Sequence, residues 1–155
     1  MTATGAIPRT ASFLAVGSEL LGTTRLDTNS LFLSERLASL GIELRSKTVV
    51  GDNRREVAEH LRRALDRVDL VIMTGGLGPT DDDVTRDALA DVLGVALVEY
   101  PEIVERLIQR FARRGFTMPS VNRRQALVIQ GGVVLDNPNG TAPGQMVEVG
   151  HRLVV

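Results

Sequence analysis

The chain has 155 residues, of which 43% are hydrophobic and 24% are charged, enough for one domain with a buried core. Its 18 basic and 19 acidic residues give a net charge of −1, so the basic surplus of a nucleic-acid-binding protein is missing. The absence of cysteine excludes disulfides, thiolate nucleophiles and cysteine-ligated metals. The chain shows no secretory signal and no run of about 18 apolar residues, which predicts a cytoplasmic protein that does not span a membrane.

The first half of the chain alternates short apolar runs with amphipathic stretches, as in an α/β protein with a mostly parallel sheet. A strand is predicted at 13–16, followed by a loop at 22–28 and a helix that ends at Gly41. A second strand at 42–50 leads to a helix opened by Asn53, because Glu56 stands three residues later as in a capping box.

The most apolar short run, 69–74, predicts a central strand buried on both faces. A glycine-rich turn follows it, then a helix predicted over 81–93 and a short edge strand at 95–98. Pro101 suits the first turn of another helix, which ends at Gly115. Beyond it, the glycine and asparagine-rich turns between 126 and 149 predict short strands and hairpins near the C-terminus rather than another strand-helix unit. Residues 1–10 are expected to form a flexible N-terminus ahead of a domain at 11–155.

Polar and glycine residues follow two of the predicted strands directly. Ser18 and Glu19 come after the first strand, and Gly75, Gly76 and Gly78 come after the central one. Ligands of an open parallel sheet bind beyond the carboxyl ends of its strands, and a glycine-rich turn into a helix is a ready anion site. The same glycines also suit a plain strand-to-helix turn, and the loop alone does not decide between the two.

Three consecutive acidic residues, Asp81, Asp82 and Asp83, follow Thr80. Thr80 is a natural N-cap, and one or two carboxylates in the first helical turn are explained by the helix dipole. Three repel one another and place negative charge where a phosphate would bind. This arrangement favours a hard cation such as Mg²⁺, held by carboxylates and substrate phosphate oxygens.

Two later segments leave their interpretation open. The polar run 122–125 is either a solvated surface or a loop that reaches a pyrophosphate. The run 140–144 is either a turn or one wall of a pocket. The pair Arg113-Arg114 and both histidines are predicted to be solvated.

Six motifs together resemble the N-terminal domain of the CinA family, and the resemblance covers residues 11–155 in one register. They are Gly17-Ser18-Glu19-Leu20-Leu21, Asp27-Thr28-Asn29, Gly51-Asp52-Asn53, Thr74-Gly75-Gly76-Leu77-Gly78-Pro79-Thr80 with Asp82-Asp83, Asn122-Arg123-Arg124-Gln125-Ala126, and Asn137-Pro138-Asn139-Gly140-Thr141-Ala142-Pro143-Gly144. The CinA domain belongs to the molybdopterin-binding superfamily, together with the MoaB and MogA adenylyltransferases and MoeA. Those adenylyltransferases carry Thr and Arg where this chain has Leu77 and Asp82, which favours the CinA branch.

The resemblance implies a three-layer αβα fold and an ADP-ribose pyrophosphatase that uses a divalent metal (Mg²⁺, Mn²⁺ or Co²⁺), with K⁺ as a helper. It also implies a homo-oligomer, either a dimer or a trimer, with a small nucleotide or pterin ligand. The family continues past the last strand into a Leu-Pro-Gly-Pro-Pro-x-Glu segment and often into a deamidase domain, so we expect this domain to lack its last segment.

The resemblance also suggests roles for individual residues. The loop glycines and Thr80 would bind phosphate, Asp83 and Asp82 would hold the metal, and Glu19 would be a further ligand or would orient the attacking water. The remaining positions would shape the pocket or contact the diphosphate and ribose: Asn29, Asp52, Arg123, Gln125, Thr141 and Gly144. The alternatives are a binding module for molybdopterin or a nucleotide that breaks no bond, an adenylyltransferase-like protein, and an assembly domain with a vestigial site.

Overall fold

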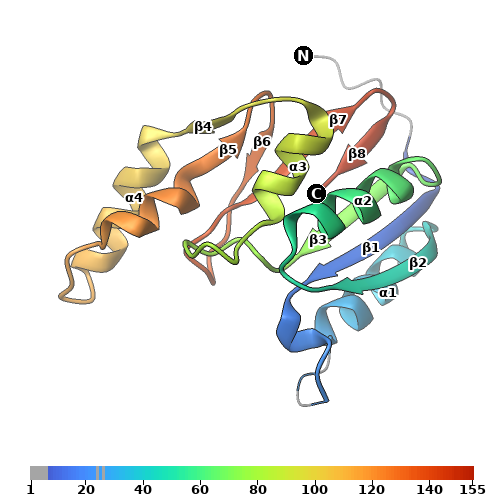
Figure 1. Cartoon of the computed structure of the whole chain (residues 1–155), viewed down its shortest axis with the longest axis horizontal. Coiled ribbons are helices and arrows are strands. Elements are labelled where there is room, and N and C mark those ends of the chain that lie inside the picture. Colours follow the sequence, from blue (N-terminus) through green and yellow to red (C-terminus); the bar gives the residue numbers. More distant parts are fainter. Residues whose placement is uncertain (1–6, 24, 26) are drawn as a thin grey trace.

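The computed structural model describes residues 7–23, 25 and 27–155. They form a six-stranded sheet in the order β2-β1-β3-β8-β7-β6 and a separate two-stranded sheet of β4 and β5 (Figure 1). The large sheet is built from β1 (Thr10–Val16), β2 (Glu43–Val50), β3 (Leu70–Thr74), β6 (Val133–Leu135), β7 (Gly144–Val149) and β8 (Arg152–Val154). The small sheet pairs β4 (Leu97–Glu99) with β5 (Leu127–Ile129).

The helices connect these strands in chain order. They are α1 (Thr28–Ser39), α2 (Arg54–Leu65), α3 (Thr85–Leu93) and α4 (Pro101–Ala112), with two 3₁₀ helices, η1 (Ser18–Leu20) and η2 (Ser120–Ala126). The predicted cap of α2 is confirmed, because Oδ1 of Asn53 accepts hydrogen bonds from the N–H groups of Arg55 and Glu56 at 3.0 and 3.2 Å. None of the helices in the described residues is long and apolar enough to cross a bilayer.

The sheet is mostly parallel, as the sequence predicts. β1 pairs in parallel with β2 and β3, and β8 pairs in parallel with β3, whereas β7 runs antiparallel to both of its neighbours. The short strands β6, β7 and β8 form the expected hairpin region near the C-terminus. The carboxyl ends of β1, β2 and β3 therefore meet at one edge of the sheet, which is where a ligand site is expected.

Helices cover both faces of the sheet and make three layers (Figure 1). On one face α2 and α3 pack on alternate strand residues such as Leu14 and Val71, which are at most 2% exposed. On the other face α1 packs through Leu37 against the opposite set of strand residues, including Leu70. The period-two alternation of a strand explains how one run serves both cores.

Three sequence expectations need correction or completion. The strand predicted at 95–98 lies at Leu97–Glu99 and pairs only with β5, so it is not an edge of the main sheet. The helix predicted from Asp81 begins at Thr85, for a reason given below. Of the segment 1–10 expected to be flexible, residues 1–6 lie outside the described residues, whereas Thr10 begins β1 and its N–H donates to Asp69 at 2.9 Å.

Candidate functional site

The loops that follow β1, β2 and β3 are in contact with one another. The N–H of Gly17 donates to the carbonyl of Val50 at 2.9 Å. Ser18 and Asp52 exchange two hydrogen bonds: the Ser18 N–H donates to Asp52 Oδ2 at 2.9 Å, and the Asp52 N–H donates to Ser18 Oγ at 3.2 Å. Asp52 therefore holds the loop after β1 in position.

Gly75 brings the loop after β3 against the end of β1. Its φ is +86°, and a Cβ built on it would lie 1.9 Å from the carbonyl oxygen of Val16. No side chain fits there, so this glycine is required by a close approach of two backbones. The three strand ends consequently form one continuous edge, which we call the strand-end region (residues 17–19, 51–52 and 74–83).

A pocket of about 200 Å³ opens at this edge. It brings together three of the predicted site residues, Glu19, Asn29 and Gly75. The other lining residues come from the end of β1, from η1, from the loop before α1, from the start of α1 and from the end of β3: Val16, Leu20, Arg25, Asp27, Thr28 and Thr74. The residues after the first and central strands, which the sequence predicts to share a site, thus line one pocket, and their roles stay predictions.

The pocket is lined by two acidic side chains, Glu19 and Asp27, one basic side chain, Arg25, and the start of a helix. The carboxylate of Glu19 lies 3.9 Å from the guanidinium of Arg25, and both side chains are more than half exposed. Asp27 caps α1 by accepting from the Ser30 N–H at 2.9 Å. Thr28 and Asn29 are the first two residues of α1, so their N–H groups have no carbonyl acceptor within the helix. Because both residues line the pocket, the positive end of this 12-residue helix lies at the pocket.

The glycine loop, residues 75–83, is held by Asp83. Oδ1 of Asp83 accepts from the Gly78 N–H at 2.7 Å, and its Oδ2 accepts from the N–H and hydroxyl of Thr80 at 2.9 and 2.6 Å. Burial acts to raise the pKa of Asp83, but these hydrogen bonds and the nearby Arg86 outweigh it, and the net pKa lies below its usual range.

These contacts explain why α3 starts four residues later than predicted. Val84, not Thr80, is the N-cap residue, and the helix begins at Thr85. The Asp83 carboxylate takes the loop N–H groups as its partners instead of joining a helical turn. Asp81 and Asp82 are exposed and also precede the helix, so the prediction that all three acids lie in its first turn is wrong.

Arg86 is a candidate site residue that the sequence analysis did not single out. Only 3% of it is exposed, and its Nη1 and Nη2 donate to the carbonyls of Leu77 and Gly78 at 2.6 and 2.7 Å. Burial lowers the pKa of this guanidinium, although the charges of Asp83 and Asp87 act against that effect. No carboxylate of the described residues lies within ion-pair distance of it. A buried positive charge is therefore built into the wall of the glycine loop.

The polar run 122–125 lies in η2 and reaches the glycine loop through a residue other than the one predicted. Arg123 pairs with Glu99 of β4. Its neighbour Arg124 instead pairs with Asp81 at 2.6 Å and approaches Asp87 at 3.5 Å. The arginine that contacts the loop is Arg124.

Gln125 and Thr141 connect η2 to the segment between β6 and β7 through a side-chain hydrogen bond. Gln125 is buried and donates from Nε2 to the hydroxyl of Thr141 at 2.9 Å, while its Oε1 accepts from Asn122 at 3.2 Å. Gly144, at the start of β7, lines a small apolar cavity together with Leu77 and Arg86. Thr141 lines a different pocket beside α4. None of the three residues Gln125, Thr141 and Gly144 lines the pocket that contains Glu19.

The predicted metal ligands do not come together. Within the described ranges, no three histidine, aspartate or glutamate side chains are grouped so that they could hold a metal ion. Glu19 faces the pocket, Asp82 is exposed, and both oxygens of Asp83 already accept hydrogen bonds inside the loop. These residues do not fit a resident metal held by the three predicted carboxylates.

Comparison with known proteins identifies the domain. Residues 12–155 match the family described as "Probable molybdopterin binding domain". The chain is 50% identical over 138 residues to a CinA-like protein of Koribacter versatilis, covering 89% of this chain and 33% of that protein. It is 41% identical over 145 residues to a putative competence-damage inducible protein of Caldicellulosiruptor saccharolyticus, covering 94% and 35%. The chain thus spans about a third of the length of these curated relatives.

Two solved structures show the same fold. The crystal structure of the protein CinA with unknown function from Thermoplasma acidophilum superposes with a TM-score of 0.84 at 32% identity, covering 94% of this chain and 85% of that one. The molybdopterin biosynthesis enzyme MoaB from Thermus thermophilus superposes with a TM-score of 0.57 at 24% identity, covering 94% and 77%. The α/β fold with a mostly parallel central sheet and a short hairpin region is therefore confirmed. The chain belongs to the CinA-like members of the molybdopterin-binding domain family.

Proposed function

We propose that this domain binds the diphosphate of a small nucleotide at the strand-end region and hydrolyses it, with ADP-ribose as the best candidate substrate. The observation that carries this proposal is Arg86, a buried cation whose direct partners are two loop carbonyls. Burying a charge is costly unless an opposite charge compensates it. Asp83 and Asp87 compensate this charge in part, although neither pairs with it directly, and a phosphate bound at the glycine loop would add to that compensation.

Backbone groups around the loop suit an anion, and they must outweigh the two carboxylates that also line the pocket, Glu19 and Asp27. Gly75 lines the pocket and presents backbone without a side chain, and the first N–H groups of α1 lie across from it. Partial positive charges of this kind stabilise phosphate oxygens without a conformational change on binding. Arg25 adds a flexible guanidinium at the rim of the pocket.

Hydrolysis of the diphosphate forms a bond between a water oxygen and one phosphorus and breaks that phosphorus's bond to the bridging oxygen. The products from ADP-ribose are AMP and ribose 5-phosphate. Glu19 is the one carboxylate in the pocket that caps no helix, and we assign it the role of orienting the water and accepting its proton. No step here requires a metal held by the protein; the effect of Mg²⁺, Mn²⁺ or Co²⁺, with K⁺, is a matter for the assay.

The second candidate is a binding module for a molybdopterin or nucleotide that breaks no bond. The separation of Glu19, Asp82 and Asp83 favours it, because the described carboxylates do not form one catalytic cluster. The family match supports a pterin or nucleotide ligand for either candidate.

The deciding experiment incubates the pure protein with ADP-ribose and each divalent metal, with and without K⁺, and measures AMP. We expect AMP from the wild type and a loss of kcat of about a hundredfold in Glu19→Gln. Glu43→Gln, an exposed glutamate on β2 outside the pocket, is the matched control and should retain full activity. Binding of ADP-ribose without AMP under any condition would favour the binding module, and equal turnover by Glu19→Gln would contradict the role of Glu19.

A further inference from the structure

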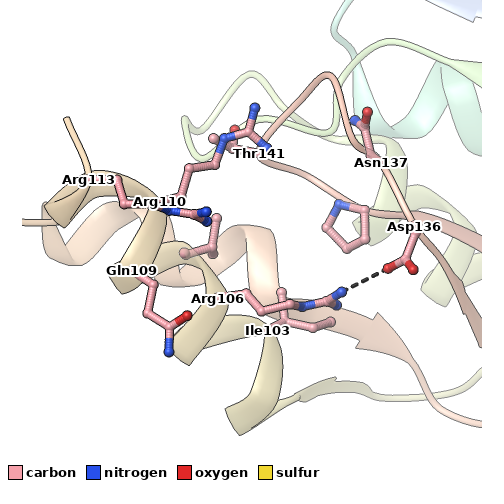
Figure 2. A pocket seen from close by; sticks show the side chains of 10 residues that line it. Ile103, Arg106, Gln109, Arg110, Arg113, Asp136, Asn137 and Thr141 are labelled. Atoms are coloured by element: carbon pink, nitrogen blue, oxygen red, sulfur yellow. Dashed lines mark hydrogen bonds and ion pairs between the residues drawn. The ribbon is translucent and has the colours of Figure 1, made fainter.

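A second pocket lies away from the strand-end region, between α4 and the loop that joins β6 to β7. Its volume is about 160 Å³, and it shares no lining residue with the pocket that contains Glu19. Figure 2 shows the side chains that line it. Its floor is apolar, formed by buried residues of α4 (Ile103 and Leu107) and by the buried Pro143. We call it the arginine pocket because of its rim.

Three arginines of α4 and its C-cap form the rim. Arg106, Arg110 and Arg113 are spaced four and three residues apart, so they lie along one face of the helix. Asp136 is the single acidic residue among the lining residues, and the pocket therefore carries a net charge of about +2 at neutral pH. A charged cluster with an apolar floor and a concave shape differs from an evenly solvated helix face.

The three guanidinium groups are engaged to different degrees. Arg110 donates to the carbonyls of Gly140 and Asn139, which orient its fork but leave its charge uncompensated. Arg106 pairs with Asp136 at 2.8 Å, and Figure 2 shows these two side chains pointing toward each other. The side chain of Arg113 makes no hydrogen bond or ion pair within the part of the chain that the structure describes, although it lines the pocket.

We infer that the arginine pocket is a binding site for the phosphate group of a small phosphate monoester, separate from the nucleotide site proposed above. A phosphate dianion matches the net charge of the rim, and the planar donors of arginine match its oxygens in pairs. The apolar floor would take the organic part of the ester. Asp136 acts against this ligand, because it occupies Arg106 and repels an anion.

Because Asp136 opposes an anion and Arg113 favours one, substitutions at these two positions should change phosphate affinity in opposite directions. Inorganic phosphate is titrated into the full chain, and backbone amide shifts in ¹H–¹⁵N spectra are followed separately for residues 101–113 and 136–143 and for residues 75–83. We expect saturable shifts in the first group. Arg113→Gln should weaken that binding about tenfold, and Asp136→Asn, which frees Arg106, should strengthen it.

Arg114→Gln is the matched control, since Arg114 also follows the end of α4 but does not line the pocket. It should bind phosphate as the wild type does. If phosphate shifts only residues 75–83, or if Arg113→Gln binds as tightly as the wild type, the inference is overturned. The proposed function is judged on the other group of signals and on AMP formation, so the two proposals fail independently.

Discussion

The strand-end region and the arginine pocket both have arginine beside a concave surface, but they are built differently. In the strand-end region, the backbone of Gly75 packs against that of Val16, and the short side chain of Asp83 accepts hydrogen bonds from N–H groups of its own loop. In the arginine pocket, long exposed side chains reach across from α4 to a loop. We therefore expect the first region to keep its shape when a ligand binds and the second to rearrange around one, which is the difference between a preorganised and an adaptable site.

The largest expected effect is that of Gly75→Ala. The new Cβ would lie 1.9 Å from the Val16 carbonyl oxygen at a φ of +86°, so two strands must separate, at a cost of about 3–5 kcal/mol in the free energy of unfolding. Gly94→Ala is the control: its φ is +65° but nothing lies within 4 Å, and about 1 kcal/mol is expected. Urea unfolding measures both, and equal losses would show that the close approach does not matter.

Arg86→Met tests whether the buried charge serves a ligand. We expect ADP-ribose to bind about ten- to a hundredfold more weakly, with affinity for uncharged adenosine unchanged, because the lost interaction is with phosphate. Arg86→Lys keeps the charge and should restore part of the affinity. A purely structural role would instead weaken both ligands together in calorimetric titrations.

Asp83→Asn should lower the free energy of unfolding by about 1–3 kcal/mol at pH 7, because it weakens hydrogen bonds made to a charged carboxylate. Since the pKa of Asp83 is lower in the folded state, its contribution is fully present above the unfolded pKa of about 4 and is lost as the pH falls through the folded pKa. The difference between variant and wild type should therefore shrink as the pH falls below about 4. Asp82→Asn serves as the control, because the Asp82 side chain makes no such hydrogen bonds within the described residues. For this variant we expect no comparable change in the free energy of unfolding at pH 7.

The smallest effect is expected in the arginine pocket. Arg106→Gln removes an ion pair whose side chains are 53% and 84% exposed, so the melting temperature should change by about 2 °C or less. A much larger drop in a thermal scan would mean that the arginine pocket is as rigid as the strand-end region, and the distinction between the two regions would then be lost.

The fold was largely predictable from the sequence because its first half follows regular periodicities. The cap at Asn53 and the central strand predicted at 69–74 are local signals, and the structure confirms both, with β3 at Leu70–Thr74. The start of α3 was not predictable in the same way. Thr80 and the acidic residues after it are typical of a helix start. The Asp83 carboxylate instead accepts hydrogen bonds from N–H groups of the preceding loop, and the helix begins only after it.

The site was only partly predictable. Strand ends placed Glu19 and Gly75 together, but the choice between Arg123 and Arg124 depends on side-chain direction in a 3₁₀ helix, where neighbours point about 120° apart. Arg86 lies off the apolar stripe of Val84 and Ala88, which predicts an exposed position. Arg86 is buried because α3 packs against both α2 and β5. These contacts are between segments distant in the sequence, so the local residue pattern does not predict them.

β8 has a consequence for the order of folding. This strand of three residues lies between β3 and β7, with Leu70 opposite Leu153, and it joins the parallel part of the sheet to the hairpin strands. The contact spans more than half of the chain, and such non-local pairings form slowly because a long loop must close first. We expect β1, β2, β3 and their helices to assemble early and β6–β8 to dock late, so amide protection in a pulsed hydrogen-exchange experiment should reach Val147 after Leu14.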